Sequence, residues 1–541
     1  MNTSCNSIRN IDTVPGNIIH QICCFLTQSD IVNLVIACPN LQSAALPSIY
    51  RCIVIDPTPR SLHEVRALRQ SRGQGPTTVT YTCVNTVYGI KKFFSAVEKP
   101  EHAAMVHSLV CRGNLSVGDN ELILRLCKSL QNLINLEELE WQACPELPPS
   151  VLAYLPRHIS SLCIDIASRS EVQLPNVRLP NLRRFHVRPF LNLRVLSWLT
   201  DVTSESVDLE DVSLSRFLDN KEQVGSSYTF LGTSDVNFDN CTSENVPVSL
   251  FFSPFSRSPL ELKSLALTQV DLTVEDSKIL SKNINLKSIK QLTLLGTGNE
   301  SNFFFLELLA EAKPQLTHLH LDWKSVPSRI ISKLLGPSLI SLQMHVYNEI
   351  HAILNDIVNN SPNILYLQLS NLETDSFVAP APVIGTFELG EIPVVERPAT
   401  LTDDANNNRI LYNLNGNGNR ANAASTGYNL SDLEPLQKLK KLVVLDIPYK
   451  PSSNNWLIAY GLPSLKVLKL KSSVNQRGPG GLLTNGLLDQ WNNHLCSPLQ
   501  YKSIIDSVRT TALDYLCIAG TVICLNYNAP PIESYDQLQR P

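Results

Sequence analysis

Two histidines separated by one residue, His318 and His320, are the strongest candidates in this sequence for binding a metal ion. Alternate residues of a β-strand point to the same face, so both imidazoles can face one ligand. A metal site needs further ligands, and Asp322 and His345 are the conceivable ones. The alternative is that these are ordinary polar residues on one face of a sheet. Because no Cys or His pair at zinc-ligand spacing accompanies them, the sequence predicts no metal and no cofactor.

Catalytic nucleophiles and phosphate-binding loops would be a second kind of chemistry, and each has a recognisable motif. Gly416 and Gly418 lie among asparagines in low-complexity sequence, not between a strand and a helix, which excludes a phosphate-binding loop. Neither a G-K-[ST] loop nor a G-x-S-x-G elbow occurs. Many cysteines lie inside apolar, periodic segments, as do Cys23, Cys111, Cys163 and Cys517. We therefore expect a protein that is not an enzyme, with reduced thiols, located in the cytoplasm, the nucleus or both.

The elements that carry the remaining polar residues belong to a repeat that begins near residue 105. Its pattern is L-x-x-L-x-L, as in LKSLAL (262–267) and LTHLHL (316–321). Most units recur at roughly 23 to 30 residues, the period of leucine-rich repeats, which this region resembles. Each unit predicts a short strand with its apolar residues in a shared core, followed by a helix or a loop. One repeat cannot bury its own apolar face, so the units must stack.

The residues between the leucines are expected to point away from the core, onto a concave surface. Arg184 and Arg188 form a basic strip there, between strips of acidic residues. Alternating charge on a curved surface suits the selection of a protein partner, although it also suits simple solubility. If the partner carries phosphate, the two arginines would bind it. The predicted target-binding residues are Glu138, Glu140, Asp165, Arg184, His186, Arg188, Asp211, Asp235, His318, His320, Asp322, His345 and Tyr366.

The segment 14–55 has a different pattern, with apolar residues at helical spacing in three short bursts. Pro15 suits a first helical turn, and Ser29 before Asp30 is a plausible N-cap. About forty residues make a core that is marginal alone, so such a module usually needs a partner. The alternative is a helical cap on the larger domain.

The order of residues in this segment resembles an F-box. The matching features are Val14-Pro15, the amphipathic run from Ile18 to Leu26, Asp30-Ile31, Ala37-Cys38 and the closing Tyr50-Arg51. The resemblance implies docking onto a Skp-family adaptor, which can join a cullin–RING ubiquitin ligase. The predicted adaptor-binding residues, which we expect to divide between the interior of the module and the adaptor face, are Val14, Pro15, Ile18, Ile19, Ile22, Phe25, Leu26, Ile31 and Leu34.

The predicted fold class is therefore α/β. A three-helix F-box-like module is followed by an irregular leucine-rich-repeat solenoid, with parallel strands on the concave face and helices or loops on the convex face. The expected divisions are the module (12–55), a linker and solenoid cap (56–104), repeats (105–372), a flexible Asn/Pro-rich insertion (373–432), C-terminal repeats (433–527) and a frayed tail (528–541).

The composition narrows the function further. The chain has 541 residues and a formal net charge of −4, without a polybasic segment, so we expect no nucleic-acid partner. We also expect no secretory signal and no membrane insertion, since no apolar run is long enough. The chain as a whole resembles fungal-type F-box proteins with degenerate leucine-rich repeats, which implies the substrate-recognition subunit of an SCF-type ligase. The rival interpretation is an F-box–adaptor complex that acts outside a ligase, as a scaffold or as a binding inhibitor of a partner such as a small GTPase.

Overall fold

The structure is a computed structural model. It describes residues 14–23, 25–26, 28–38, 41–57, 81–115, 121–144, 146–166, 174–189, 192–216, 246–268, 270, 272–295, 302–321, 326–346, 350–370, 428–448, 454–471, 498–518, 521–530, 532, 535 and 538.

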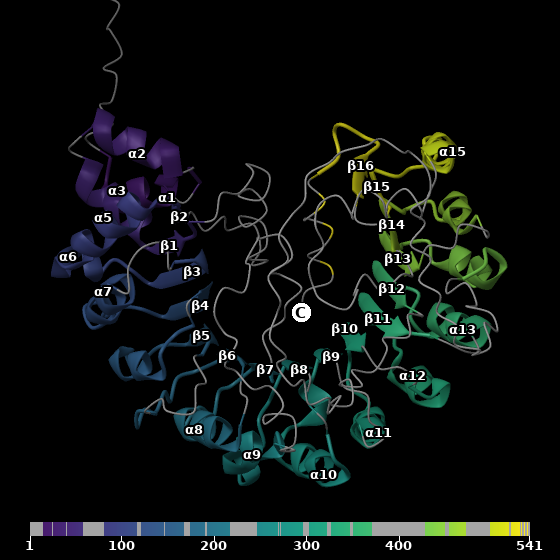
Figure 1. Cartoon of the computed structure of the whole chain (residues 1–541), viewed down its shortest axis with the longest axis horizontal. Coiled ribbons are helices and arrows are strands. Elements are labelled where there is room, and N and C mark those ends of the chain that lie inside the picture. The colour runs from purple at the N-terminus through teal and green to yellow at the C-terminus, as the bar shows by residue number, and fades with distance from the viewer. Residues whose placement is uncertain are drawn as a thin grey trace, which may run out of the picture.

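The chain forms an arc with strands on its inner side and helices on its outer side (Figure 1). Among the described residues, sixteen strands form one sheet in the order β16-β15-β14-β13-β12-β11-β10-β9-β8-β7-β6-β5-β4-β3-β1-β2. The strands are β1 (Cys52–Ile55), β2 (Thr82–Val84), β3 (Ser108–Asn114), β4 (Glu138–Cys144), β5 (Ser161–Asp165), β6 (Arg184–Arg188), β7 (Asp211–Ser215), β8 (Ser264–Thr268), β9 (Gln291–Leu295), β10 (His318–Leu321), β11 (Ser341–His345), β12 (Tyr366–Ser370), β13 (Val444–Pro448), β14 (Val467–Lys471), β15 (Tyr515–Ile518) and β16 (Thr521–Cys524). All of the neighbouring strands are parallel except β15 and β16, which form an antiparallel pair.

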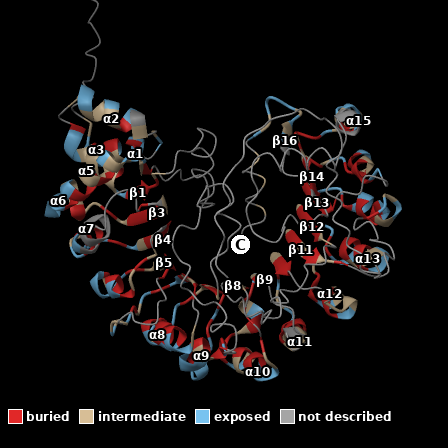
Figure 2. Cartoon of the chain, viewed as in Figure 1, coloured by how far each residue is buried: buried red, intermediate tan, exposed pale blue. Residues whose placement is uncertain are grey.

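The returns between strands are short helices. The described α-helices are α1 (Gly16–Cys23), α2 (Gln28–Ala37), α3 (Gln42–Tyr50), α5 (Val87–Val97), α6 (Pro100–Ala103), α7 (Glu121–Leu130), α8 (Leu193–Thr203), α9 (Ser249–Phe252), α10 (Val274–Asn283), α11 (Asn302–Ala312), α12 (Ser328–Leu334), α13 (Ile350–Asn360) and α15 (Pro498–Val508). Segments of 3-10 helix replace or extend them at η3 (Pro149–Tyr154), η6 (Ser253–Ser256), η7 (Leu286–Ser288), η8 (Ser431–Lys438) and η10 (Asn455–Gly461). Burial follows the strands and the inner sides of the helices, and exposed residues lie on their outer sides (Figure 2).

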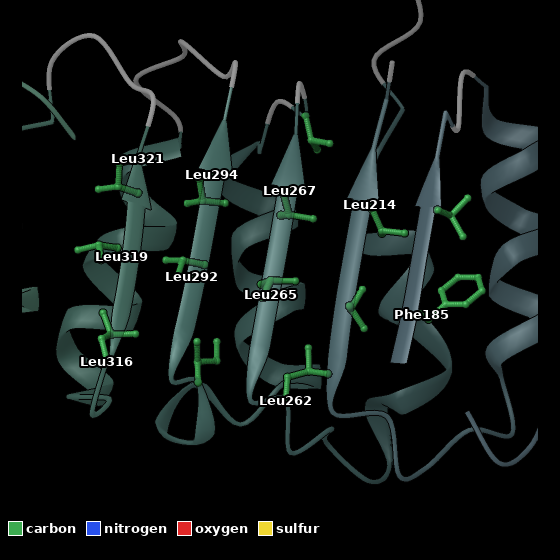
Figure 3. Close-up of a cluster of buried hydrophobic side chains, with 14 of the residues drawn as sticks. Phe185, Leu214, Leu262, Leu265, Leu267, Leu292, Leu294, Leu316, Leu319 and Leu321 are labelled. Atoms are coloured by element: carbon green, nitrogen blue, oxygen red, sulfur yellow. The ribbon is translucent and has the colours of Figure 1, made fainter. Parts of the chain in front are cut away.

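The L-x-x-L-x-L pattern explains why the strands stack. Its second and third apolar residues point to the helix side of the sheet, where equivalent residues lie in register, such as Leu265 beside Leu292 and Leu292 beside Leu319. All three side chains are fully buried, and Figure 3 shows the ladder that they build with their neighbours. Each fully buried leucine contributes about 1.5–3 kcal/mol of transfer free energy, so the stability of a repeat depends on the next one.

The ends of the sheet differ from the sequence-based divisions. Cys52–Ile55, assigned to the N-terminal module by sequence, form β1 of the sheet, because Ile53 and Ile55 enter the main core. The insertion leaves the sheet continuous, since β12 pairs directly with β13. Residues 373–427 of that insertion lie outside the described residues. In the tail, expected to fray, Ile532, Tyr535 and Leu538 pack against the sheet.

Candidate protein-binding surfaces

The N-terminal helices have a small core of their own. Ile19 and Cys23 of α1, Ile31 of α2, and Leu41 and Ala45 beside and within α3 are buried together, apart from the main core. Among the predicted adaptor-binding residues, Ile19 and Ile31 therefore hold the module together. Val14, Leu26 and Leu34 are half-buried against the same core.

Other predicted adaptor-binding residues are exposed to solvent. Ile18 and Ile22 are 40% and 43% exposed, and Phe25 is 78% exposed. Positions i, i+4 and i+7 share one side of a helix, so Ile18 and Ile22 continue along α1 toward Phe25, just after its end. Pro15 is also exposed. This stretch therefore presents apolar side chains that the module does not bury.

Ile36 of α2 is 72% exposed, and the sequence analysis did not single it out. Its helix is apolar around much of its circumference, so the spacing did not separate a buried from an exposed face. The signal that could have identified Ile36 is that this ten-residue helix has more apolar residues than its buried side can hold.

The module is attached to the first strands of the solenoid without a spacer. Helix α3 ends at Tyr50, and β1 begins at Cys52. The carbonyl oxygen of Arg51, between them, accepts hydrogen bonds from the backbone N–H groups of His107 and Ser108 at 2.9 Å each. The Tyr50 ring also stacks on His102, with 5.1 Å between ring centroids. These contacts fix the module against the solenoid.

The inner face of the sheet carries the second surface. Positions in register form rows that cross the strands, and one such row contains the first residue of each strand from β3 to β15. From β6 to β11 this row is polar, in the order Arg184, Asp211, Ser264, Gln291, His318 and Ser341. From β12 to β15 it changes to Tyr366, Val444, Val467 and Tyr515. Along this row the concave face thus changes from polar to apolar after β11, and we call Tyr366, Val444, Val467 and Tyr515 the apolar sector; the next row on the same face carries Gln368, Asp446 and Lys469.

Charged residues of the polar part of this face pair with one another across strands. Arg188 of β6 donates to Asp165 of β5, with Nε–Oδ1 at 2.6 Å, and Arg184 of β6 donates to Asp211 of β7, with Nε–Oδ2 at 3.1 Å. Further along, Arg112 of β3 donates from Nε to Oε1 of Glu140 on β4 at 2.8 Å. The predicted acidic and basic strips therefore neutralise each other in the free protein.

Asp211 lies at the centre of this cluster. His186 Nε2 is 3.0 Å from Asp211 Oδ1, and Arg184 contacts the other carboxylate oxygen. Burial would raise the pKa of Asp211, but the hydrogen bond and charge of His186 and the charge of Arg184 outweigh burial. The pKa of Asp211 consequently lies below its ordinary value, and the carboxylate is ionised at neutral pH.

Elsewhere on this face, Glu138 accepts a hydrogen bond from the Ser108 hydroxyl, with Oγ–Oε2 at 3.0 Å. Cys163, beside Glu140 in register, is half-buried, and desolvation of its thiol, together with the charges of Glu140 and Asp165, raises its pKa to about 12 and makes it a poor nucleophile. The cysteines that form no disulfide are Cys23, Cys38, Cys52, Cys83, Cys111, Cys163, Cys517 and Cys524.

The two histidines on β10 do not assemble a metal site with described residues. His320 is buried, and its Nε2 lies 2.9 Å from the hydroxyl of Ser341. Burial, and to a lesser degree the charge of His318, lowers the pKa of His320 to about 4. His345 ends the next strand, and Asp322 lies outside the described residues. Within the described ranges, no three His, Cys, Asp or Glu side chains come together to hold a metal ion.

Two further predicted target-binding residues are Tyr366 and Asp235. Tyr366 was expected on the open concave surface, but its side chain is fully buried, because apolar side chains of the C-terminal segment cover it. Asp235 lies outside the described residues. Sequence reasoning missed the apolar sector, although the change from polar to apolar residues at the first strand position after β11 was a visible signal.

No protein-family model matches the chain, and no curated protein matches it either. Among solved structures, the leucine-rich repeat-containing protein LegL7 from Legionella pneumophila is similar, with 13% sequence identity and a TM-score of 0.28. The match covers 78% of this chain and 95% of LegL7. No described helix has the length and apolarity needed to cross a membrane. By its own strands and register, the chain is an α/β solenoid of leucine-rich units with a parallel concave sheet.

Proposed function

We propose that this protein is the substrate-recognition subunit of an SCF-type cullin–RING ubiquitin ligase, present in the cytoplasm, the nucleus or both. The helices α1–α3 form an F-box that docks on a Skp-family adaptor, which links the chain to the cullin–RING core. The concave sheet binds a target protein. The chain itself performs no catalysis, and its contribution is to hold the target close to the charged conjugating enzyme.

The observation that carries this proposal is that the N-terminal helices have both buried and exposed apolar residues. They bury one set of apolar residues in a separate core and leave Ile18, Ile22 and Phe25 exposed. A simple helical cap would turn such residues toward the repeat that it covers. An exposed apolar face of this kind is typical of a docking site for another protein.

The target-binding half rests on the concave face. Its charges are arranged in cross-strand pairs, so an incoming segment of complementary charge can exchange partners with them one at a time. Charge pairs on a binding surface favour selectivity over raw affinity, because a segment that lacks the complementary charges leaves them unmatched.

The test is co-purification from cells that express the tagged chain. We expect the wild-type protein to recover a Skp-family adaptor and a cullin, and the Ile18→Asp/Ile22→Asp variant to lose both. Ile134→Asp is the matched control, because Ile134 is exposed on the solenoid, remote in sequence from the module. Circular dichroism of the purified variants checks that the repeats stay folded.

Unchanged adaptor recovery by the folded double variant would refute the docking proposal. Recovery of the adaptor without the cullin would replace the ligase by a scaffold or inhibitor complex. Target proteins are then identified as those whose recovery on the wild-type chain rises when the proteasome is inhibited, whereas their recovery on the double variant, which keeps its concave sheet but cannot reach the ligase, does not depend on the inhibitor.

A further inference from the structure

The apolar sector of the concave face is covered by the chain's own C-terminal segment. Tyr366, Val444 and Val467 have no exposed surface, although they occupy the row that faces the inside of the arc. Ile532, Tyr535 and Leu538 pack on them. Figure 1 shows yellow pieces of this segment on the inner side of the arc.

The contacts are specific in both their apolar and their polar parts. The ring of Tyr535 meets the ring of Tyr515 edge to face, with 6.2 Å between centroids. Its hydroxyl donates to Asp514 Oδ2 at 2.7 Å. This carboxylate is also held by Asn526, whose Nδ2 donates to Asp514 Oδ1 at 2.8 Å. The backbone of Leu538 makes a hydrogen bond with His318, at the start of β10.

The spacing of the three packed residues defines the ligand. Ile532, Tyr535 and Leu538 are three positions apart, and Ile532 and Tyr535 are helical. Residues three apart in a helix share one side, so aliphatic, tyrosine and aliphatic side chains are presented together. The row that receives them consists of Tyr366, Val444, Val467 and Tyr515, with Val443 packed beside it and the carboxylate of Asp514 at its edge.

The described contacts of the tail are few for a segment that covers part of a sheet. The three tail side chains are half-buried, the Tyr535 hydroxyl donates to Asp514, and the backbone of Leu538 makes a hydrogen bond with His318. The tail follows β16 after a few residues, so its local concentration is on the order of millimolar. A contact that is weak between separate molecules is therefore largely formed within one chain.

We propose that the apolar sector is a peptide-binding site for segments that present an aliphatic residue, a tyrosine and a second aliphatic residue at three-residue spacing, and that the C-terminal tail is its tethered competitor. A target must displace the tail before it can occupy strands β12–β15. The proposal refines the target-binding half of the proposed function. Its test needs no adaptor, so the two can fail independently.

The probe is a fluorescein-labelled synthetic peptide with the sequence of residues 528–541, added to the full-length protein and followed by fluorescence anisotropy. The tail-releasing variant is Tyr535→Glu, because a carboxylate placed beside Asp514 is repelled by it. Leu538→Asp is a second releasing variant of independent design. Tyr527→Glu is the matched control, since Tyr527 belongs to the same segment but is 98% exposed.

We expect the peptide to bind both releasing variants about 10- to 100-fold more tightly than it binds the wild type or Tyr527→Glu, because the millimolar tethered competitor is removed. Adding Val444→Asp to a releasing variant is expected to abolish binding. Once the tail is gone, position 444 faces solvent, so an aspartate there leaves the sheet folded, as circular dichroism checks.

Three results would overturn the proposal. The first is equal affinity with and without tail release, and the second is no binding to either releasing variant. The third is binding that Val444→Asp leaves unchanged, which would place the peptide elsewhere. Tail-dependent dimerisation of the wild type, measured by light scattering, would also contradict it and assign the surface to a second copy of the chain.

Discussion

The buried imidazole of His320 makes a quantitative prediction about acid sensitivity. In the folded protein its pKa is about 4, against 6.5 in an ordinary environment. Above pH 6.5 the imidazole is neutral in both folded and unfolded states and contributes no pH dependence. As the pH falls from 6.5 toward 4, the imidazole binds a proton in the unfolded state but stays neutral in the folded state. The stability of the surrounding repeats is therefore present above pH 6.5 and is lost progressively below it.

The magnitude follows from the shift. One pKa unit corresponds to about 1.4 kcal/mol, so the full difference between the two states is about 3 kcal/mol by pH 4. At pH 5 the loss is about 2 kcal/mol, or about 30-fold in the equilibrium constant for opening. The perturbation is His320→Gln, which removes the titrating group and retains a polar side chain next to the hydroxyl of Ser341.

Hydrogen–deuterium exchange is the suitable assay, because repeat arrays can open locally without unfolding as a whole. Exchange of peptides that span β10 and β11 is compared between wild type and variant at pH 7 and at pH 5. Comparing the two proteins at the same pH cancels the intrinsic pH dependence of exchange. The wild type should lose about 30-fold more protection than His320→Gln between the two pH values, and parallel losses would refute the burial argument.

Three further predictions concern other parts of the molecule. Replacing Leu292 with alanine removes a fully buried side chain from the ladder and should cost about 2–5 kcal/mol, measured by urea unfolding; a loss below about 1 kcal/mol would mean that the site collapses. Asp211→Asn should destabilise the concave charge cluster by about 1–3 kcal/mol at pH 7. Because the pKa of Asp211 is lowered in the folded state, this difference should begin to shrink as the pH falls through the ordinary pKa of an aspartate and should vanish only below the folded-state pKa; a difference independent of pH would show that the charge is not responsible. Phe25→Ala should weaken adaptor binding by about 1–2 kcal/mol, or about 5- to 30-fold by calorimetry, since most of this ring is exposed, whereas Val207→Ala, also exposed, should have no effect.

The repeat architecture could be predicted because the leucine pattern is local and periodic. The pattern LTHLHL at 316–321 contains β10 (His318–Leu321). Alternation within a strand decides which side chains are buried, so the second and third leucines of each unit could be assigned to the core from the sequence. The helix or loop that the pattern predicts after each strand is a helix after β10 and after β11, where α12 and α13 lie.

What could not be predicted depends on contacts between residues far apart in sequence. The cover over Tyr366 comes from residues more than 160 positions later, so no local window contains it. The cross-strand pairing of Arg188 with Asp165 required the register between repeats of unequal length. The helical spacing in the N-terminal segment gave a set of candidate apolar residues, but which of them face solvent depended on how α1, α2 and α3 pack against one another.

The junction at Arg51 has a consequence for geometry. With one residue between α3 and β1, and with its carbonyl held by two N–H groups of the next repeat, the chain has no hinge at this point. Anything bound to the exposed face of the helices is kept at a constant distance and angle from anything lying within the arc. If ubiquitin is delivered from that side, the lysine that is modified on a bound protein would be selected by its position relative to the arc, and not by the residues around that lysine.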